Sequence, residues 1–526
     1  MAKPRIMFEN DSRHTLIYMY EPPIQLEDHQ LVIDELLGTP VEALVFNLGY
    51  GNAFLHATEI GDRWNSEAFA TLPFRPTGGK QWEHVVFMRA YRNAEKLIAE
   101  GNDPLRIVCE RAHKHNLLLY PSLQLNSAMS QKELTIGGNK NVHEDFPGSA
   151  LGDFRHQEVR AHRLALIEEV MQNYDVDGFE LNLSHYAGRH FFDPAYASEK
   201  KRTIMSDFIA RVAEIVHGSK PDCELAVRMS TNFAELDSQG LDPGEWARVG
   251  YIDVIMGESA NGAQVIDPTA DFGALLKCTE GNECRIHGVL RNHVDSDRLN
   301  TAPIQMIRAT ASNYWNQGVT GLLCAHWFGN WPYGPEFYEE MRELPFPEVM
   351  AAKDKIYAIP TVTGRLPEPA QVNQLPINLE AGSTVQLLLP ISDDLQRWKQ
   401  TEHVHEVILR IRITRVTELD FFRFALNGRD LPEQIQRKIN HAYQISSPRF
   451  RSHPSYWFVF KLGPEHWPQQ GDNHIEITLL ERDPELTPEL AVRDVEIEIR
   501  YLRSKNYHRG IHNTDPDLGP FEHANT

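Results

Sequence analysis

The chain has 526 residues, of which 41% are hydrophobic and 24% are charged, and this composition is typical of a globular protein rather than a disordered one. Its 73 acidic residues outnumber its 52 basic residues, so the net charge of −21 disfavours nucleic acid as a partner, because a phosphate backbone would be repelled. No apolar run approaches the roughly 18 residues of a membrane-spanning helix, so no membrane partner is expected.

The cysteines and the first residues of the chain indicate the cellular compartment. Five cysteines are too few for a disulfide framework, and none forms a Cys-x-x-Cys pair, which favours a reducing compartment. The opening residues contain no apolar segment of the secretory type. Together these features predict a cytoplasmic protein.

Short apolar runs that alternate with amphipathic segments dominate the first two thirds of the chain. They are Arg5–Glu9, Ala43–Leu48, Leu117–Leu123, Gly178–Leu183, Glu224–Met229, Asp253–Met256, Arg285–Leu290 and Gly321–Ala325. Such runs are typical of strands buried on both faces, and the segments between them have helical spacing. About eight repeats predict a (β/α)8 TIM barrel over residues 1–343. An open doubly wound sheet is the alternative, but no Gly-x-Gly-x-x-Gly motif follows an early strand.

The remaining third changes character twice. Six prolines punctuate residues 344–376, which predicts a linker on the surface. Alternating apolar runs then return without helices over residues 377–503, and Asn427-Gly428 between two such regions is a turn signal. This pattern predicts an antiparallel β-sandwich of jelly-roll type, followed by a loosely ordered tail over residues 504–526.

The active site of a TIM barrel lies at the carboxyl ends of its strands. In the fourth predicted strand Glu180, Asn182 and Ser184 share one parity and therefore point to the same, inward face. A polar row inside a barrel is costly unless it lines a site, so Glu180 is a catalytic candidate. The alternative is that Glu180 and Arg228 of the next strand form an internal ion pair.

Two further carboxylates are catalytic candidates. Glu258 ends the sixth strand and, with Glu180, would supply the pair of carboxyl groups that glycosidic cleavage needs; the alternative is a loop carboxylate that faces water. Asp11 follows the first strand. The predicted substrate-binding residues are Asn182, Arg228, His287, Tyr50, Tyr186, His326, Trp327 and Trp331.

Four insertions after the strands are rich in aromatic residues, interleaved with Asn, Arg and His. This combination is typical of sugar sites, because rings stack on apolar sugar faces while polar groups bind hydroxyls. The alternative is that half or more of these rings only pack the insertions. No His-Glu-x-x-His, phosphate-binding loop or Gly-x-Ser-x-Gly motif is present, so neither a metal nor a cofactor is expected.

Several motifs carry a family resemblance over nearly the whole chain. They are Pro4–Asp11, Tyr20–Pro23, Asp103–Leu105, Glu110–His113, Glu158–Arg163, Tyr174–Glu180, Leu426–Gly428 and Gly471–Glu476. On these residues the chain resembles the family-10-like glycosyl hydrolases, which implies a TIM barrel with a trailing β-domain. The family's Asp in the fourth strand is Asn182 here. Ser184 stands where the related chitinase motif has its general acid, so the resemblance does not imply a chitinase mechanism.

Three functions follow as hypotheses. The first is a glycoside hydrolase that acts on an oligosaccharide with Glu180 and Glu258. The second is a lyase for uronic-acid glycans, in which Tyr186 or His287 would remove the proton. The third is a non-catalytic glycan-binding protein, with Tyr456, Trp457 and Trp467 of the sandwich as candidate ligands for sugar; its alternative is a sandwich that only braces the barrel. A homo-oligomer is compatible with all three.

Overall fold

The computed structural model describes residues 3–50, 53–64, 80–125, 128–129, 150–184, 190–193, 195–260, 265–294, 301–327, 331–361, 373–440, 455–502, 514–515 and 519–520. The chain divides into two compact units, each of which is described by itself. The first unit comprises Met1–Ala260, Asp271–Val289 and Val319–Pro345. The second comprises Asn261–Ala270, Leu290–Gly318 and Phe346–Thr526.

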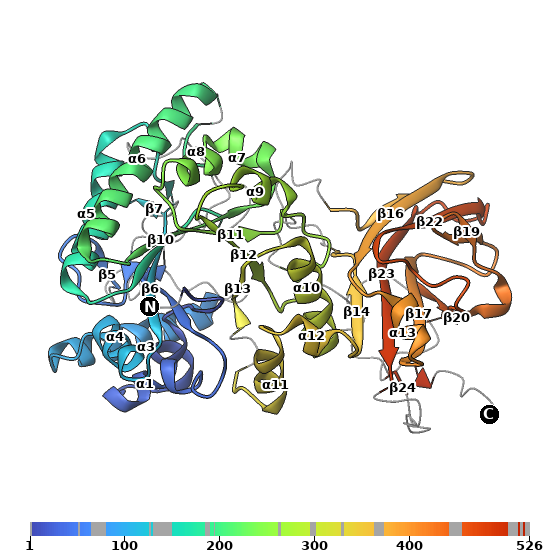
Figure 1. The fold of residues 1–526 in the computed structure, drawn as a ribbon, viewed down its shortest axis with the longest axis horizontal. Coiled ribbons are helices and arrows are strands. Elements are labelled where there is room, and N and C mark those ends of the chain that lie inside the picture. Colours follow the sequence, from blue (N-terminus) through green and yellow to red (C-terminus); the bar gives the residue numbers. More distant parts are fainter. Residues whose placement is uncertain are drawn as a thin grey trace. The chain divides into compact units, whose positions relative to one another are not determined.

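A closed barrel of eight parallel strands forms the centre of the first unit (Figure 1). The strands are β1 (Ile6–Asn10), β2 (Ala43–Asn47), β6 (Leu118–Gln124), β9 (Gly178–Asn182), β10 (Glu224–Ser230), β11 (Val254–Glu258), β12 (Arg285–Leu290) and β13 (Gly321–Cys324). Their spatial order follows the chain, and β13 pairs with β1 to close the ring. The predicted TIM barrel is therefore confirmed, and the open doubly wound alternative is wrong.

Helices connect successive strands, as the helical spacing predicted. They are α1 (Leu26–Asp34), α3 (Lys80–Ala99), α4 (Pro104–Lys114), α5 (Gln157–Asn173), α6 (Ser198–Ser219), α7 (Phe233–Gln239), α8 (Pro243–Arg248), α9 (Gly273–Cys278), α10 (Ile304–Gln317), α11 (Pro335–Glu343) and α12 (Pro347–Met350). Their starts have local causes. Asp103 accepts the backbone N–H of Arg106, and Pro104 at the first turn presets the helical φ of α4.

Acidic residues hold the amino-terminal end of the barrel together. Glu42 accepts the backbone N–H of Ile6, Asp177 that of Leu119, and Asp253 that of Leu225, at 3.2, 2.9 and 2.8 Å. Each acid precedes or opens one strand and binds the start of its neighbour. These carboxylates therefore satisfy strand-end donors that would otherwise lack partners.

Shorter elements decorate the loops of the first unit. They are the π-helical segment His14–Met19, a small sheet of β3 (Gly49–Tyr50), β4 (Ala53–Phe54) and β5 (Asp62–Arg63), and the pair β7 (Ala128–Met129) and β8 (Ala150–Leu151). All of these lie on segments that follow β1, β2 or β6. The insertions therefore extend the carboxyl end of the barrel.

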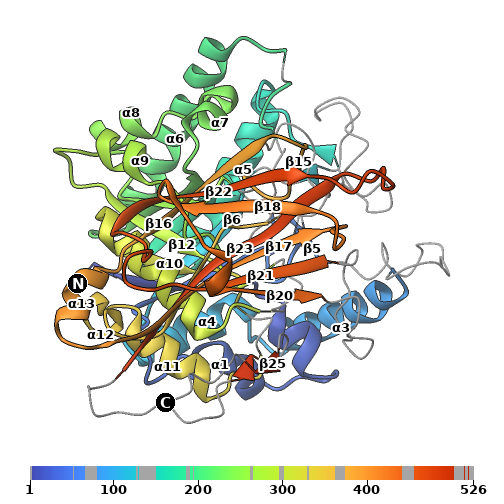
Figure 2. The same ribbon diagram turned by 90° about the vertical axis from the view of Figure 1, so that its right-hand side faces the viewer.

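The second unit contains two antiparallel sheets that enclose one apolar core (Figure 2). One sheet has β14 (Lys355–Ala358), β15 (Ile377–Leu379), β17 (Val404–Thr414), β20 (Gln436–Asn440), β21 (Ser455–Lys461) and β23 (Leu490–Tyr501). The other has β16 (Thr384–Ile391), β18 (Phe421–Leu426), β19 (Arg429–Asp430) and β22 (Gly471–Glu481). The one-turn helix Glu433–Ile435, helix α13 (Leu395–Gln400) and the short pair β24 (Thr514–Asp515) and β25 (Gly519–Pro520) complete the elements. The structure shows the predicted antiparallel sandwich.

Two domain boundaries need correction. Residues 344–376 are not one continuous linker, because they contain α12 and strand β14, which pairs with β23 and buries its apolar residues. Residues 1–343 are not one unit either, since α10 groups with the sandwich, where Ala309 joins the apolar core. Residues 362–372 and most of the predicted tail lie outside the described residues.

Two of the three sandwich residues predicted as candidate sugar ligands serve packing. Trp457 is buried with Ile408, Ile439 and Val459, while Trp467 is half-buried against the core and donates its indole N–H to the Leu462 carbonyl. These two side chains therefore pack within the sandwich and do not form an open sugar-binding face. Among the described helices, none is long and apolar enough to cross a membrane.

Candidate active site

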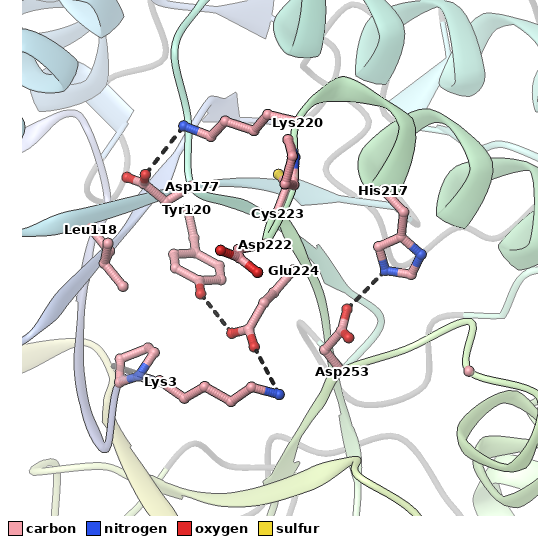
Figure 3. A pocket seen from close by; sticks show the side chains of 13 residues that line it. Lys3, Leu118, Tyr120, Asp177, His217, Lys220, Asp222, Cys223, Glu224 and Asp253 are labelled. Carbon is pink, nitrogen blue, oxygen red and sulfur yellow. Dashed lines mark hydrogen bonds and ion pairs between the residues drawn. The ribbon is translucent and has the colours of Figure 1, made fainter. Parts of the chain in front are cut away.

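A cavity of about 490 Å³ opens at the amino-terminal end of the barrel, and Figure 3 shows that its charged side chains face one another. Glu224 accepts the Tyr120 hydroxyl at 2.8 Å and pairs with Lys3, and Asp177 pairs with Lys220. These charges are neutralised within the cavity wall. Since this end of a TIM barrel serves stability, we place the candidate site at the opposite end.

Glu258 occupies the carboxyl end of β11 at the mouth of the barrel. Its side chain is largely buried, with 7% of the residue exposed, and its Oε2 accepts a 2.5 Å hydrogen bond from the Ser184 hydroxyl. Ser184 follows β9, and Ser230 at the end of β10 is the register partner of Glu258. Three consecutive strands therefore converge on this carboxylate.

A second carboxyl group, Glu235, lies in the same place. It belongs to α7, the helix that begins directly after β10, and Asn232 caps that helix by accepting the N–H groups of Ala234 and Glu235. Burial raises the pKa of Glu235, the charge of Glu258 raises it further, and a hydrogen bond with Ser230 opposes the shift. Two carboxyl groups therefore lie at the mouth of the barrel, and one of them, Glu235, has a raised pKa that favours its protonated form.

Sequence reasoning missed Glu235. The inward parity of a strand identifies residues such as Glu180 but stops where the strand stops. The available signal was Asn232, a typical N-cap two residues after β10, which predicts a helix that begins at the mouth and carries Glu235 in its first turn.

Glu180 forms the internal ion pair that the sequence left open as an alternative. Arg228 donates from Nε to Glu180 Oε1 at 2.6 Å and from Nη1 to Glu9 Oε1 at 2.8 Å. Glu180 and Arg228 are 0% exposed. Burial raises the pKa of Glu180, against the opposing effect of Arg228. The Glu9–Arg228–Glu180 triad thus lies inside the barrel, below Glu258.

Asn182 and His287 were predicted to bind substrate, and both are buried in the barrel. Asn182 sits above Glu180 and accepts the backbone N–H of Ser184 at 3.2 Å, so it shapes the turn that delivers the hydroxyl to Glu258. His287 packs against Gly321, where even a methyl group would lie 2.5 Å from its Nε2. Burial lowers the pKa of His287 to about 3, so the imidazole is neutral.

A second group of side chains gathers where β1 and β13 end. Asp11 accepts from both the backbone N–H and the Nε of Arg13 at 3.1 Å. The ring of His14 lies 5.4 Å from that of Trp331 and 5.8 Å from that of Tyr18, between centroids. Trp331 is half-buried and Tyr18 is 39% exposed, so both present ring surface to solvent.

The remaining predicted residues divide three ways. His326 is half-buried at the end of β13, and its backbone N–H donates to Glu9 Oε2 at 3.1 Å. Trp327 is fully buried and packs edge-on against Phe337, whereas a sugar-stacking role requires an accessible ring; the prediction for Trp327 needs this correction. The side chain of Tyr50 and the whole of Tyr186 lie outside the described residues.

Most described aromatics of the insertions are buried, including Phe54, Trp64, Phe191 and Phe192. The packing alternative therefore holds for them, whereas Trp331 and Tyr333 of the described residues are only half-buried. Across the described part of the chain, no group of three or more His, Cys, Asp or Glu side chains is arranged to hold a metal ion.

Comparisons with known proteins give only distant similarity. No family model matches the chain, and no curated protein matches it. A cycloisomaltooligosaccharide glucanotransferase from Paenibacillus sp. is 10% identical, with 94% of this chain and 57% of that chain covered and a TM-score of 0.35. The α-L-fucosidase isoenzyme 2 from Paenibacillus thiaminolyticus is 11% identical, with 66% and 50% covered and a TM-score of 0.40.

An α-amylase from Geobacillus thermoleovorans, in complex with acarbose, is 11% identical, with 91% of this chain and 98% of that chain covered and a TM-score of 0.38. The chain thus spans little more than half the length of the glucanotransferase and half that of the fucosidase. Similarity at this level does not define a family, and the resemblance drawn from the sequence motifs stays a prediction.

Proposed function

We propose that the protein is a glycoside hydrolase whose reacting carboxyl groups are Glu258 and Glu235. The observation that carries the proposal is their arrangement at the carboxyl end of the barrel. They come from β11 and from the helix after β10, each has a serine hydroxyl as a neighbour, and the charge of Glu258 helps to raise the pKa of Glu235. Glycosidic cleavage uses one protonated and one ionised carboxyl group in this way.

Their environments suggest the assignment. Glu235 has a raised pKa and would donate its proton to the glycosidic oxygen as the bond breaks. Glu258 accepts a hydrogen bond from Ser184 and would act as a carboxylate, either as nucleophile or as the base that activates water. The accessible rings of Trp331 and Tyr18 would stack on the sugar, and His326 would bind a hydroxyl.

This proposal modifies the pair predicted from sequence. Glu258 is retained, and Glu180 becomes part of the charged support beneath it, because a side chain with no exposed surface and an arginine partner is poorly placed to reach a substrate. No observation favours the lyase. Of its two candidate bases, His287 is buried, and Tyr186 lies outside the described residues.

The test uses Glu258→Gln and Glu235→Gln variants, assayed on 4-nitrophenyl glycosides and on maltooligosaccharides by release of reducing ends. We expect each variant to lose roughly 10²–10⁴-fold in kcat on a substrate that the wild type cleaves. Glu235→Gln should also abolish the alkaline limb of the pH–rate profile, since that limb reports loss of the acid's proton. Glu224→Gln, at the far end of the barrel, is the matched control and should keep wild-type turnover.

Several outcomes would redirect the proposal. Near wild-type turnover in both variants would refute the Glu258–Glu235 pair, and a large loss confined to Glu180→Gln and Glu258→Gln would restore the pair predicted from sequence. Absorbance of an unsaturated uronate on a pectic or alginate substrate would indicate the lyase. Calorimetric binding of a glycan with no product would indicate a glycan-binding protein.

A further inference from the structure

His326 has an unusual backbone conformation at the mouth of the barrel. Its φ is 58°, in the left-handed region that residues other than glycine rarely adopt. Ser12, which follows β1, has a φ of 61°. Strands β1 and β13 are neighbours, so two strained residues lie at the same edge of the barrel mouth. Such strain persists only where the surroundings enforce it, and it clusters at functional sites.

Glu9 enforces the conformation of His326. One carboxylate oxygen, Oε2, accepts the His326 backbone N–H at 3.1 Å, and the other, Oε1, accepts Arg228 Nη1 at 2.8 Å. Arg228 is fixed in turn by its 2.6 Å bond to Glu180. All three side chains are buried, so the carboxylate has one orientation and its hydrogen bond to His326 is shielded from water.

The enforced backbone conformation affects the position of the His326 side chain. Cys324, Ala325 and Trp327 are buried, whereas His326 is half-buried, so within this run His326 is the residue with accessible surface at the mouth. The Nε2 atom of its ring is turned inward, which leaves Nδ1 as the ring nitrogen for a ligand. A residue in the extended conformation would send its side chain in another direction, since left-handed φ values reverse the local course of the chain. The triad therefore determines where the imidazole is presented.

We propose that Glu9, oriented by Arg228, is a positioning residue that holds His326 in the left-handed conformation so that its imidazole binds a hydroxyl group of the sugar. This inference rests on the proposed function. It assigns to the buried triad a role in substrate binding as well as in stability.

The first experiment replaces His326 by glycine, which adopts φ values near 58° without strain. The melting temperature should stay unchanged or rise by about 2 °C, since the strain is relieved. On the 4-nitrophenyl glycoside that the wild type cleaves fastest, KM should rise at least about tenfold with a smaller change in kcat, as expected for a lost binding contact. A fall in melting temperature would mean that His326 is a structural residue and would overturn the inference.

The second experiment is a double-mutant cycle with Glu9→Gln. If Glu9 acts through His326, Glu9→Gln should raise KM in the wild-type background and leave it unchanged in the His326→Gly background. Glu224→Gln, which alters the partly buried Glu224–Arg285 pair at the other end of the barrel, is the control and should leave KM at the wild-type value. An equal effect of Glu9→Gln in both backgrounds would overturn the inference.

The two proposals fail in distinguishable ways. If the wild type cleaves none of the glycosides, the proposed function fails, and the melting temperature of His326→Gly still tests the enforced conformation without any substrate. If the wild type is active and His326→Gly keeps the wild-type KM, the positioning role fails while the proposed function stands. If Glu9→Gln does not fold, His326→Gly alone decides, by its melting temperature and its KM.

Discussion

At the scale of single residues, the barrel interior places one guanidinium between two carboxylates. Arg228 bonds to Glu9 and Glu180, and all three are shielded from water. Such a group stabilises the protein only while it is complete, because each ion was taken out of water at a cost that its partners offset.

Removal of the Arg228 guanidinium should therefore destabilise the protein more than the loss of its buried side-chain area alone would. Arg228→Met should lower the free energy of unfolding at pH 7 by about 3–5 kcal/mol, because two carboxylates stay buried without a counter-charge. Guanidinium denaturation measures the change. Arg285→Met is the matched control: its partner Glu224 keeps the Tyr120 hydroxyl and Lys3, so the loss should be smaller. An equal or smaller loss for Arg228→Met would contradict the prediction.

Residue-level prediction from sequence succeeded where a strand's parity decides. Glu180 and Asn182 point into the barrel because alternate residues of a strand share a face. Parity does not report depth, so it could not separate the buried Glu180 from Glu258 at the mouth. Strand parity also says nothing about residues in helices, so it could not identify Glu235 of α7. The burial of Trp327 could not be predicted either, because it depends on a contact with Phe337 of a later helix.

At the scale of elements, the β18–β19 hairpin follows from two residues. Asn427 and Gly428 have φ values of 53° and 73°, as a two-residue type I′ turn requires, and Leu426 pairs with Arg429 across it. Because nothing lies within 4 Å of the position of a Cβ on Gly428, any cost of a side chain there comes from the backbone alone.

Because only the backbone conformation is at stake at Gly428, substitutions there test its cost directly. Gly428→Ala should destabilise the protein by about 1–2 kcal/mol, the cost of a left-handed alanine. Gly428→Asn should cost clearly less, since asparagine tolerates this conformation. Thermal denaturation followed by circular dichroism compares the two variants. Equal melting temperatures for both would show that the turn conformation is not the cause.

Charged residues link two strands of the larger sheet. Glu498 of β23 accepts from Arg410 Nη2 at 2.5 Å and from Arg500 Nε at 2.6 Å. Burial works to raise the pKa of Glu498, but the two guanidinium groups outweigh it and lower that pKa to about 2. Since the folded pKa lies below the ordinary value of 4.5, this carboxylate stabilises the fold above about pH 5, and the stabilisation is lost as the pH falls towards 2.

We therefore expect the unfolding free energy to fall between about pH 5 and pH 2, and Glu498→Gln to flatten this fall by about 2–3 kcal/mol. At pH 7 the variant should be less stable than the wild type, because Arg410 and Arg500 lose a buried partner. Urea denaturation over this pH range measures both effects. Glu481→Gln, at an exposed position of β22, is the control, and an equally steep fall in Glu498→Gln would refute the prediction.

Prediction of elements depended on repetition. The eight barrel strands were found because their apolar runs recur with helices between them, and the long sandwich strands because they alternate. Strand β14 was missed since it is four residues long and stands among prolines. What makes it a strand is its pairing with β23, about 140 residues later, which no local pattern records.

At the scale of the whole molecule, the two units are interleaved along the chain. Helix α10 connects β12 to β13, both barrel strands, yet it belongs to the second unit and packs against β14 and β16. Ala309 lies in the sandwich core, and Asn313 donates to the carbonyls of Pro268 and Pro390 at 2.8 Å. The eight-stranded barrel is thus closed through a helix whose apolar face is covered by residues after 346.

A fragment of residues 1–345 should therefore fail to fold as an independent barrel. It would keep every barrel strand but expose the apolar face of α10 and leave the Asn313 amide short of one acceptor, so we expect aggregation on size-exclusion chromatography and no sharp thermal transition. Co-expression with residues 346–526 should restore a single cooperative melt, because it returns those partners without a covalent link. A monomeric 1–345 fragment that melts as sharply as the full chain would show that the barrel does not depend on the second unit.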